Sequence, residues 1–249
     1  MAANNRAVLN ALDILDLLGQ RAQHMRLRDI ASAVGLPEST TYRLISSLME
    51  RDYVRQTEPN GPYSLGWRIL TLTQALSNEM RLLNGLRPYL ESVLSQVQQT
   101  VNLGVLNHQR VVYIECLTPD GVLALYAPPG MMVPVHATAM GKALLAWLPE
   151  SDLALVLSDV KLERFTAQTL TTESALLTEL KAVRKRGYAV DRGELHAGVS
   201  CVAAAVRDPR QRPIAAISVT AHDGSVDAGW EASTAKILID TVKEAEAKL

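Results

Sequence analysis

The segment 27–65 constrains the chain most, because it combines a helix–turn–helix pattern with a turn-rich hairpin. The apolar residues of 27–34 recur at the i, i+3, i+4 and i+7 spacing that gives one face of a short helix. Residues 35–37, Gly-Leu-Pro, interrupt this helix, since glycine supplies a turn conformation and proline favours the start of a new helix. We therefore expect a second helix over 38–49.

The second predicted helix has two contrasting faces. Leu44, Ile45 and Leu48 form an apolar stripe, and the opposite face carries small hydroxyl side chains and Arg43. In a DNA-reading helix, serine and threonine reach base edges or phosphates, and arginine can bind guanine in the major groove. The opposite face of this helix consists of Ser39, Thr40, Arg43, Ser46, Ser47 and Glu50.

A hairpin directly after this helix strengthens the interpretation. Short strands are expected over 53–56 and 63–65, and the turn-rich 58–62 between them would form the wing. Residues 21–55 carry six Arg against four Asp or Glu, so this surface is only mildly basic. Because phosphate neutralisation supplies most of the non-specific affinity for DNA, we expect at least a dimer that binds two half-sites.

The composition excludes several classes of protein. The 249 residues are 48% hydrophobic and carry a formal net charge of −1, so any contact with nucleic acid must be local. The sequence contains neither a long apolar run nor a basic-then-apolar leader, which predicts a cytoplasmic protein with no membrane partner. Cys116 and Cys201 are far apart and lack CxxC spacing, so we expect no disulfide, no metal site and no cofactor.

The pattern along the chain predicts an α+β protein with three parts. Residues 1–66 would form the winged helix–turn–helix domain, 67–84 a connecting helix and linker, and 85–249 a sheet with helices around it. Asn5 can cap a first helix that ends at Gly19. The predicted buried face of this helix is Val8, Leu12, Leu15 and Leu18.

Periodicity also predicts the elements of the third part. The expected helices span 86–97, 139–147, 151–156, 173–185 and 227–247. The expected strands span 101–106, 111–116, 122–126, 188–190, 199–206 and 214–220, with a hairpin turn at 107–110.

Two segments of this part predict a small polar pocket. Thr138 can cap the helix at 139–147, where free backbone N–H groups and the helix dipole favour a carboxylate. Asp191 and Cys201 fall in one region, and alternation places Ser218 and Thr220 on one face of their strand. A small organic acid suits such a site. The expected apolar walls are Leu123, Leu125, Met131 and Met132.

Two other functions fit parts of the sequence. Cys201 with His136 or His196 could form a nucleophile and base, but we find no nucleophile elbow, phosphate loop or dinucleotide fingerprint. The N-terminal helices could instead bind another protein, which their near-neutral charge allows. The small residues of 139–146 are also typical of a tightly packed core helix, and a buried cysteine is usually inert.

Four segments together resemble the IclR-type bacterial transcriptional regulators, and their order and spacing agree from about residue 5 to 247. They are Ile30–Leu44, Thr138–Ala146, Gly187–Glu194 and Gly198–Ala203. The resemblance implies a winged helix–turn–helix with a GAF-like effector domain, dimers or tetramers, and control of catabolic operons through operator DNA.

The same resemblance implies the site residues. Glu38 departs from the basic residue often found there, Arg28 stands where a capping Ser or Thr is common, and Ala205 replaces a usual proline. The implied DNA contacts are Arg28, Ser39, Thr40, Thr41, Arg43 and Arg55. The implied effector contacts are Thr138, Ala139, Met140, Asp191, Cys201, Ser218 and Thr220.

Overall fold

The computed structural model describes residues 5–21, 24–79, 85–119 and 127–249. The chain divides into two compact units, Met1–Arg81 and Leu82–Leu249, and each unit has an apolar core of its own. Within the described ranges, no helix is long and apolar enough to cross a membrane. The strand expected at 122–126, with Leu123 and Leu125, lies outside these ranges.

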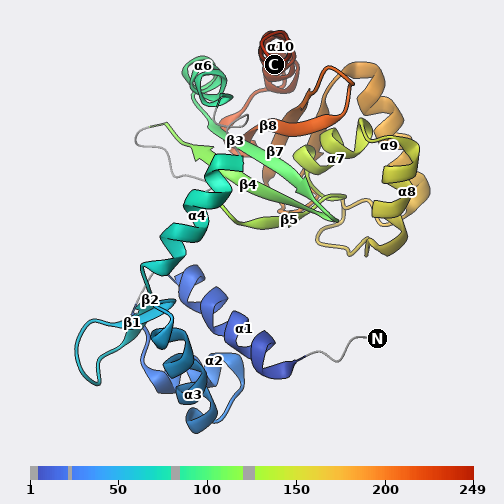
Figure 1. The fold of residues 1–249 in the computed structure, drawn as a ribbon. Coiled ribbons are helices and arrows are strands. Elements are labelled where there is room, and N and C mark those ends of the chain that lie inside the picture. The colour runs from blue at the N-terminus through green and yellow to red at the C-terminus, as the bar shows by residue number, and fades with distance from the viewer. Residues whose placement is uncertain (1–4, 22–23, 80–84, 120–126) are drawn as a thin grey trace. The chain divides into compact units, whose positions relative to one another are not determined.

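The N-terminal unit consists of helices followed by a short hairpin (Figure 1). Gly35 lies between the second and third helices and adopts a φ of +67°, the left-handed conformation that this turn requires. The predicted helix–turn–helix and wing are both present. The elements are α1 (Arg6–Arg21), α2 (Leu27–Val34), α3 (Glu38–Glu50), β1 (Val54–Gln56), β2 (Tyr63–Leu65) and α4 (Arg68–Glu79).

Helix α1 departs from the prediction in its end and its buried face. It is capped as expected, since Oδ1 of Asn5 accepts a hydrogen bond from the backbone, but it runs past Gly19. Val8 and Leu12 are 52% and 51% exposed, whereas Ile14 and Leu18 are buried. The predicted buried face is right for Leu18, and Leu15 packs against the same core, but it is wrong for Val8 and Leu12. Periodicity shows an apolar stripe without showing which part of it meets the core.

The C-terminal unit is built on one antiparallel sheet of order β5-β4-β3-β8-β7-β6. The predicted hairpin at 107–110 joins β3 and β4, and the short edge strand β5 was not predicted. The strands are β3 (Thr100–Asn107), β4 (Arg110–Leu117), β5 (Met132–Pro134), β6 (Ala189–Arg192), β7 (Val199–Arg207) and β8 (Pro213–His222). The helices are α6 (Arg87–Val97), α7 (Ala139–Ala146), α8 (Glu150–Asp159), α9 (Glu173–Arg186) and α10 (Trp230–Glu246), with a 3-10 turn at Asp223–Ser225.

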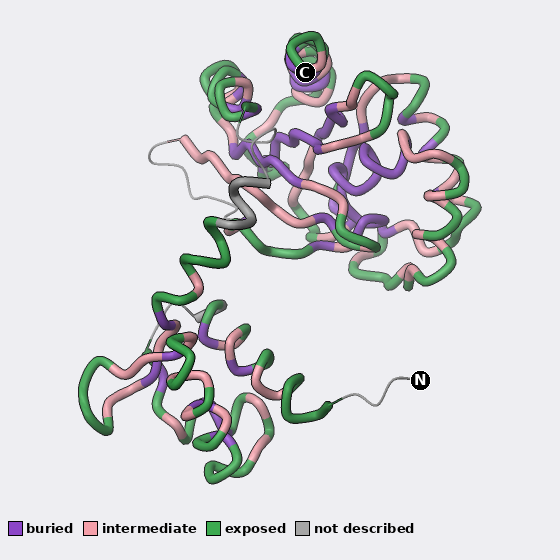
Figure 2. Tube along the Cα trace, viewed as in Figure 1, coloured by how far each residue is buried: buried purple, intermediate pink, exposed green. Residues whose placement is uncertain are grey.

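Different helices cover the two faces of this sheet. α6 and α10 lie beside each other on one face, whereas α7 lies on the other and packs against α9 (Figure 1). Every residue of α7 is buried, so this helix runs through the interior of the unit (Figure 2). The α+β fold class is therefore confirmed.

Alternation along β7 and β8 separates the two cores. Val202 and Ala204 of β7 pack towards α6 and α10, and Ala203 between them packs towards α7. On β8, Ile217 and Val219 face α6 and α10, which places Ser218 and Thr220 on the α7 face, as predicted. Small residues on that face allow α7 to approach the sheet closely.

Candidate DNA interface and effector pocket

Helix α3 presents most of its predicted contact residues to solvent. Ser39, Thr40 and Arg43 are all exposed. Tyr42 on the same helix is 55% exposed, and sequence analysis did not single it out. Polar and aromatic side chains therefore share the surface that would face DNA.

Thr41 does not belong to this surface. Its side chain is fully buried, and its hydroxyl donates a hydrogen bond to the carbonyl of Pro37 at 3.1 Å. A residue with no exposed surface cannot touch a phosphate or base, so we remove Thr41 from the expected contacts. Its spacing gives the reason, because Thr41 lies four residues before Ile45 and so shares the apolar face of α3.

The two remaining arginines occupy different environments. Arg28 is exposed within the first turn of α2, whose N-cap is Arg26 and not residue 28. The missing side-chain cap therefore lies two residues earlier than predicted. Arg55 is half-buried, since its guanidinium carbon lies 4.5 Å from the centre of the Trp67 ring and its Nε donates to the carbonyl of Leu65.

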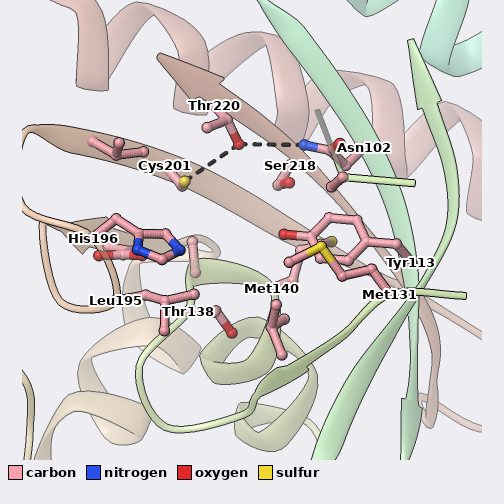
Figure 3. A pocket seen from close by; sticks show the side chains of 15 residues that line it. Asn102, Tyr113, Met131, Thr138, Met140, Leu195, His196, Cys201, Ser218 and Thr220 are labelled. Carbon is pink, nitrogen blue, oxygen red and sulfur yellow. Dashed lines mark hydrogen bonds between the residues drawn. The ribbon is translucent and has the colours of Figure 1, made fainter. Parts of the chain in front are cut away.

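The C-terminal unit contains a cavity of about 270 Å³ between the sheet and the start of α7, and Figure 3 shows its side chains. All seven residues predicted to contact an effector line this cavity. Met131 lines it as predicted, but Met132 does not. The full lining consists of Asn102, Tyr113, Ala127, Met131, Val133, Thr138, Ala139, Met140, Asp191, Leu195, His196, Val199, Cys201, Ser218 and Thr220.

One wall of the cavity is the N-terminus of α7. Oγ1 of Thr138 accepts a hydrogen bond from the backbone N–H of Gly141 at 3.2 Å and donates to the carbonyl of Pro134. The predicted cap is therefore present. Backbone N–H groups at the first positions of a helix have no partner within the helix. Those of Ala139 and Met140, both cavity-lining residues, are thus available to an anion.

Asp191 supplies a buried carboxyl group to the same cavity. Its Oδ1 accepts a hydrogen bond from the backbone N–H of Glu194 at 2.6 Å. Burial raises the pKa of Asp191 to about 7, against the lowering effect of that hydrogen bond. Lys142 does not neutralise Asp191 directly, because its ammonium forms a buried ion pair with Glu194.

Cys201 and Asn102 meet at Thr220 on the sheet wall (Figure 3). Nδ2 of Asn102 donates to Oγ1 of Thr220 at 3.3 Å, and Sγ of Cys201 lies 3.3 Å from the same oxygen. Burial raises the pKa of the Cys201 thiol to about 12, so the reactive thiolate is suppressed at neutral pH. The structure therefore disfavours a cysteine nucleophile.

The two candidate histidine partners lie in different places. His196 lines the cavity, but His136 does not, and its Nε2 lies 2.9 Å from the carbonyl of Glu163. His136 is therefore wrong as a partner for Cys201. In the described part of the chain, no group of three or more potential ligands could hold a metal ion.

Asn102 and Tyr113 were not among the pocket residues predicted from the sequence. Both side chains reach the cavity from the sheet, Asn102 from β3 and Tyr113 from β4. Each lies within a predicted strand, where one polar residue gives no signal of the side it faces. Their position became visible only from the strand order.

A winged helix–turn–helix followed by a sheet domain, with a cavity lined by apolar and polar side chains, is typical of ligand-binding transcriptional regulators. The IclR helix-turn-helix domain matches residues 7–58. The bacterial transcriptional regulator IclR C-terminal domain matches residues 74–246. The chain therefore belongs to the IclR family of transcriptional regulators, and it is not an enzyme.

Named relatives agree with this assignment. The chain is 34% identical over 222 residues to the HTH-type transcriptional regulator XynR of Escherichia coli K12, covering 89% of this chain and 88% of XynR. It is 30% identical to the transcriptional repressor IclR of the same strain, with 86% of this chain and 79% of that protein covered.

Solved structures extend the likeness to the fold. An IclR homologue from Microbacterium hydrocarbonoxydans, crystallised with 4-hydroxybenzoate, has a TM-score of 0.81 and 25% identity, and the match covers 98% of each chain. The Thermotoga maritima IclR structure has a TM-score of 0.80 and 25% identity, covering 97% of this chain and 98% of that one.

Proposed function

We propose that this regulator binds operator DNA. When a small organic acid enters the C-terminal cavity, the protein would either leave the operator or change its conformation on it. The observation that carries the proposal is the cavity itself, which places a capped helix N-terminus, a buried carboxyl group and several hydroxyls around one space. We further propose that the genes it controls form a catabolic operon and that it acts in the cytoplasm, where that DNA lies.

The proposed division of labour follows the chain. Residues 1–66 would bind DNA, 67–84 would connect, and 85–249 would bind the effector. On the DNA side, Ser39, Thr40 and Arg43 would read the major groove from α3. Arg28 would contact a phosphate, and Arg55 would act beside the wing.

An acid is the effector class that the cavity favours. The N–H groups of Ala139 and Met140 and the positive end of the α7 dipole favour a carboxylate. A cavity of about 270 Å³ accepts only a small molecule. The ring of Tyr113 lines the same space and suits an aliphatic or single-ring aromatic acid. The 4-hydroxybenzoate in the homologue's crystal structure is consistent with this class.

We propose a dimer or tetramer as the active form. The N-terminal unit exposes apolar side chains on α1 and around the start of α4, which is unusual for a surface that stays in water. A second copy would cover these side chains and supply the second DNA-reading helix that two half-sites require. The exposed apolar side chains are Val8, Leu9, Leu12, Trp67, Leu70 and Leu72.

The DNA part of the proposal can be tested by selecting random duplexes that the full-length protein retains. We expect a palindromic site and a Kd that rises steeply with salt, because counterions are released on binding. Arg43→Ala should weaken binding roughly 10- to 100-fold. Arg210→Ala, an equal change of charge on an exposed turn of the other unit, is the matched control. Failure to retain any duplex, together with a stable complex with another protein, would support the interaction module instead.

The effector part can be tested by thermal shift against a panel of small organic acids. An acid that binds only the native state raises the melting temperature by mass action. The shift should disappear in Asp191→Ala, and the same acid should change the affinity for the selected duplex. Shifts that persist unchanged in the variant would place the acid outside this cavity.

A further inference from the structure

The helix that would read DNA begins with a carboxylate. Glu38 is the first residue of α3, and its side chain is exposed. In the described part of the chain, the side-chain hydrogen bonds of α3 come from Thr41, Ser46 and Ser47, and no ion pair includes Glu38. An ionised carboxylate only accepts hydrogen bonds. Glu38 therefore presents two acceptor oxygens to a donor from outside the chain.

The position of Glu38 brings this acceptor to the bases. In a helix–turn–helix, the N-terminal residues of the second helix contact base edges in the major groove. The first three residues of α3 are Glu38, Ser39 and Thr40, and all three are exposed. Glu38 also lies one turn before the exposed Tyr42, so these two side chains share one side of the helix. The end of α3 that would enter the groove thus carries a carboxylate beside small hydroxyl groups.

A carboxylate at this place interacts very differently with phosphates and with bases. It would repel a phosphate, and residues 21–55 offer only six Arg against four acidic residues to offset that repulsion. In the major groove, guanine and thymine present acceptors, which also repel a carboxylate, whereas the amino group of cytosine donates to one. The amino group of adenine lies next to the acceptor N7, which disfavours a second acceptor there. Cytosine is therefore the base that suits Glu38 best.

We propose that Glu38 is a specificity-determining residue that accepts a hydrogen bond from the amino group of one cytosine in each operator half-site. This inference rests on the proposed function, because it takes α3 to lie in the major groove. Any other base at that position would leave the carboxylate without a well-placed donor. Replacing this cytosine should weaken binding by the wild-type protein roughly 5- to 100-fold in each half-site.

The test selects random duplexes with the full-length protein and its variants, and compares the bases retained at every position. The wild type should retain cytosine at one position of each half-site. In Glu38→Gln this preference should shift towards adenine, because a glutamine amide both donates and accepts and so matches N7 and N6 of adenine. Affinity for duplexes of unrelated sequence should rise roughly two- to fivefold, since a negative charge near the phosphates is removed.

Glu150→Gln is the matched control. Glu150 is exposed, is the first residue of α8 and follows Pro149, so it repeats in the C-terminal unit the setting of Glu38 after Pro37. Both variants remove one negative charge and one favourable interaction with the start of a helix. The control should retain the wild-type site with an unchanged Kd. A change found only in Glu38→Gln then cannot come from net charge or from helix stability.

The outcome for Glu38→Gln decides the inference. The same retained bases as in the wild type would overturn it, and an equal rise in affinity for every duplex would place Glu38 beside a phosphate. A changed preference at a position where the wild type does not retain cytosine would also contradict it. If the wild-type protein retains no duplex, the proposed operator binding fails together with this inference, whereas a wild-type site that Glu38→Gln shares contradicts the inference alone.

Discussion

The two faces of the C-terminal sheet differ, because one is a packed apolar core and the other lines a cavity, although residues of the same strands alternate between them. The face towards α6 and α10 is closed by large apolar side chains such as Ile217 and Val219. The face towards α7 combines small residues with Ser218 and Thr220 and retains a cavity. Under the proposed function, stability and effector binding would depend on neighbouring residues, and substitutions one position apart should separate the two effects.

The largest effect is expected where α7 approaches its surroundings most closely. A Cβ on Gly141 would lie 2.1 Å from the backbone oxygen of Val135, and a backbone atom cannot move aside as a side chain can. Gly141→Ala should destabilise the C-terminal unit by roughly 3 kcal/mol or more, measured by urea unfolding. Gly224→Ala is the control, since a Cβ there meets nothing within 4 Å. Similar midpoints for both variants would contradict this close packing.

The next prediction compares adjacent residues of β8. Ile217→Ala removes a fully buried side chain from the closed face and should cost roughly 2 to 5 kcal/mol of unfolding free energy. Ser218→Ala should change that free energy by less than about 1 kcal/mol, yet lower the affinity for the effector. Urea unfolding and calorimetry on both variants measure the two effects. If Ser218→Ala destabilises the protein as much as Ile217→Ala, the two faces contribute equally to stability and the contrast between them is wrong.

The carboxyl group on the cavity face should make stability depend on pH. Because burial raises the pKa of Asp191 from 3.8 to about 7, the native state keeps a proton that the unfolded chain has already lost between these values. Unfolding free energy should therefore fall as pH rises from about 4 to about 7, by up to about 4 kcal/mol.

Asp191→Asn isolates this contribution. The asparagine keeps an oxygen that can accept from the backbone N–H of Glu194 but has no charge to bury. We expect the variant to lose the fall in stability and to exceed the wild type above pH 7, while the two proteins converge near pH 4. Parallel curves across the whole range would show that Asp191 is not the group that titrates.

The features that were predicted correctly from the sequence depend on residues that lie close together in the chain. Helix starts, the Gly35 turn, the Thr138 cap and the alternation of Ser218 with its neighbours depend on residues close in the chain, and all four are present in the structure. The features that were predicted wrongly depend on packing between residues far apart in the chain. Thr41 was expected among the DNA contacts but is buried, and Val8 and Leu12 of α1 were expected in the core but are exposed.

Asn102 shows why part of the pocket was beyond reach. Its pairing with Ser218 joins residues 116 positions apart, and only the strand order β3-β8-β7 brings it beside Cys201 and Thr220. The candidate pocket residues that were predicted lay in recognisable motifs. Those that were missed lay in ordinary strands, where a sequence shows the period but not the neighbours.

The smallest predicted effect separates a helix cap from a ligand contact. Thr138 caps α7 and lines the cavity, whereas Thr172 caps α9 in the same way, through a hydrogen bond from Ala175, and does not line it. Thr138→Ala and Thr172→Ala should each cost about 1 kcal/mol of unfolding free energy. Only Thr138→Ala should lower the affinity for the acid, because fraying of α7 would displace the N–H groups proposed to bind the carboxylate. Equal affinity in both variants would mean that the acid does not bind at the start of α7. The polar side chains of the cavity face would then serve another contact.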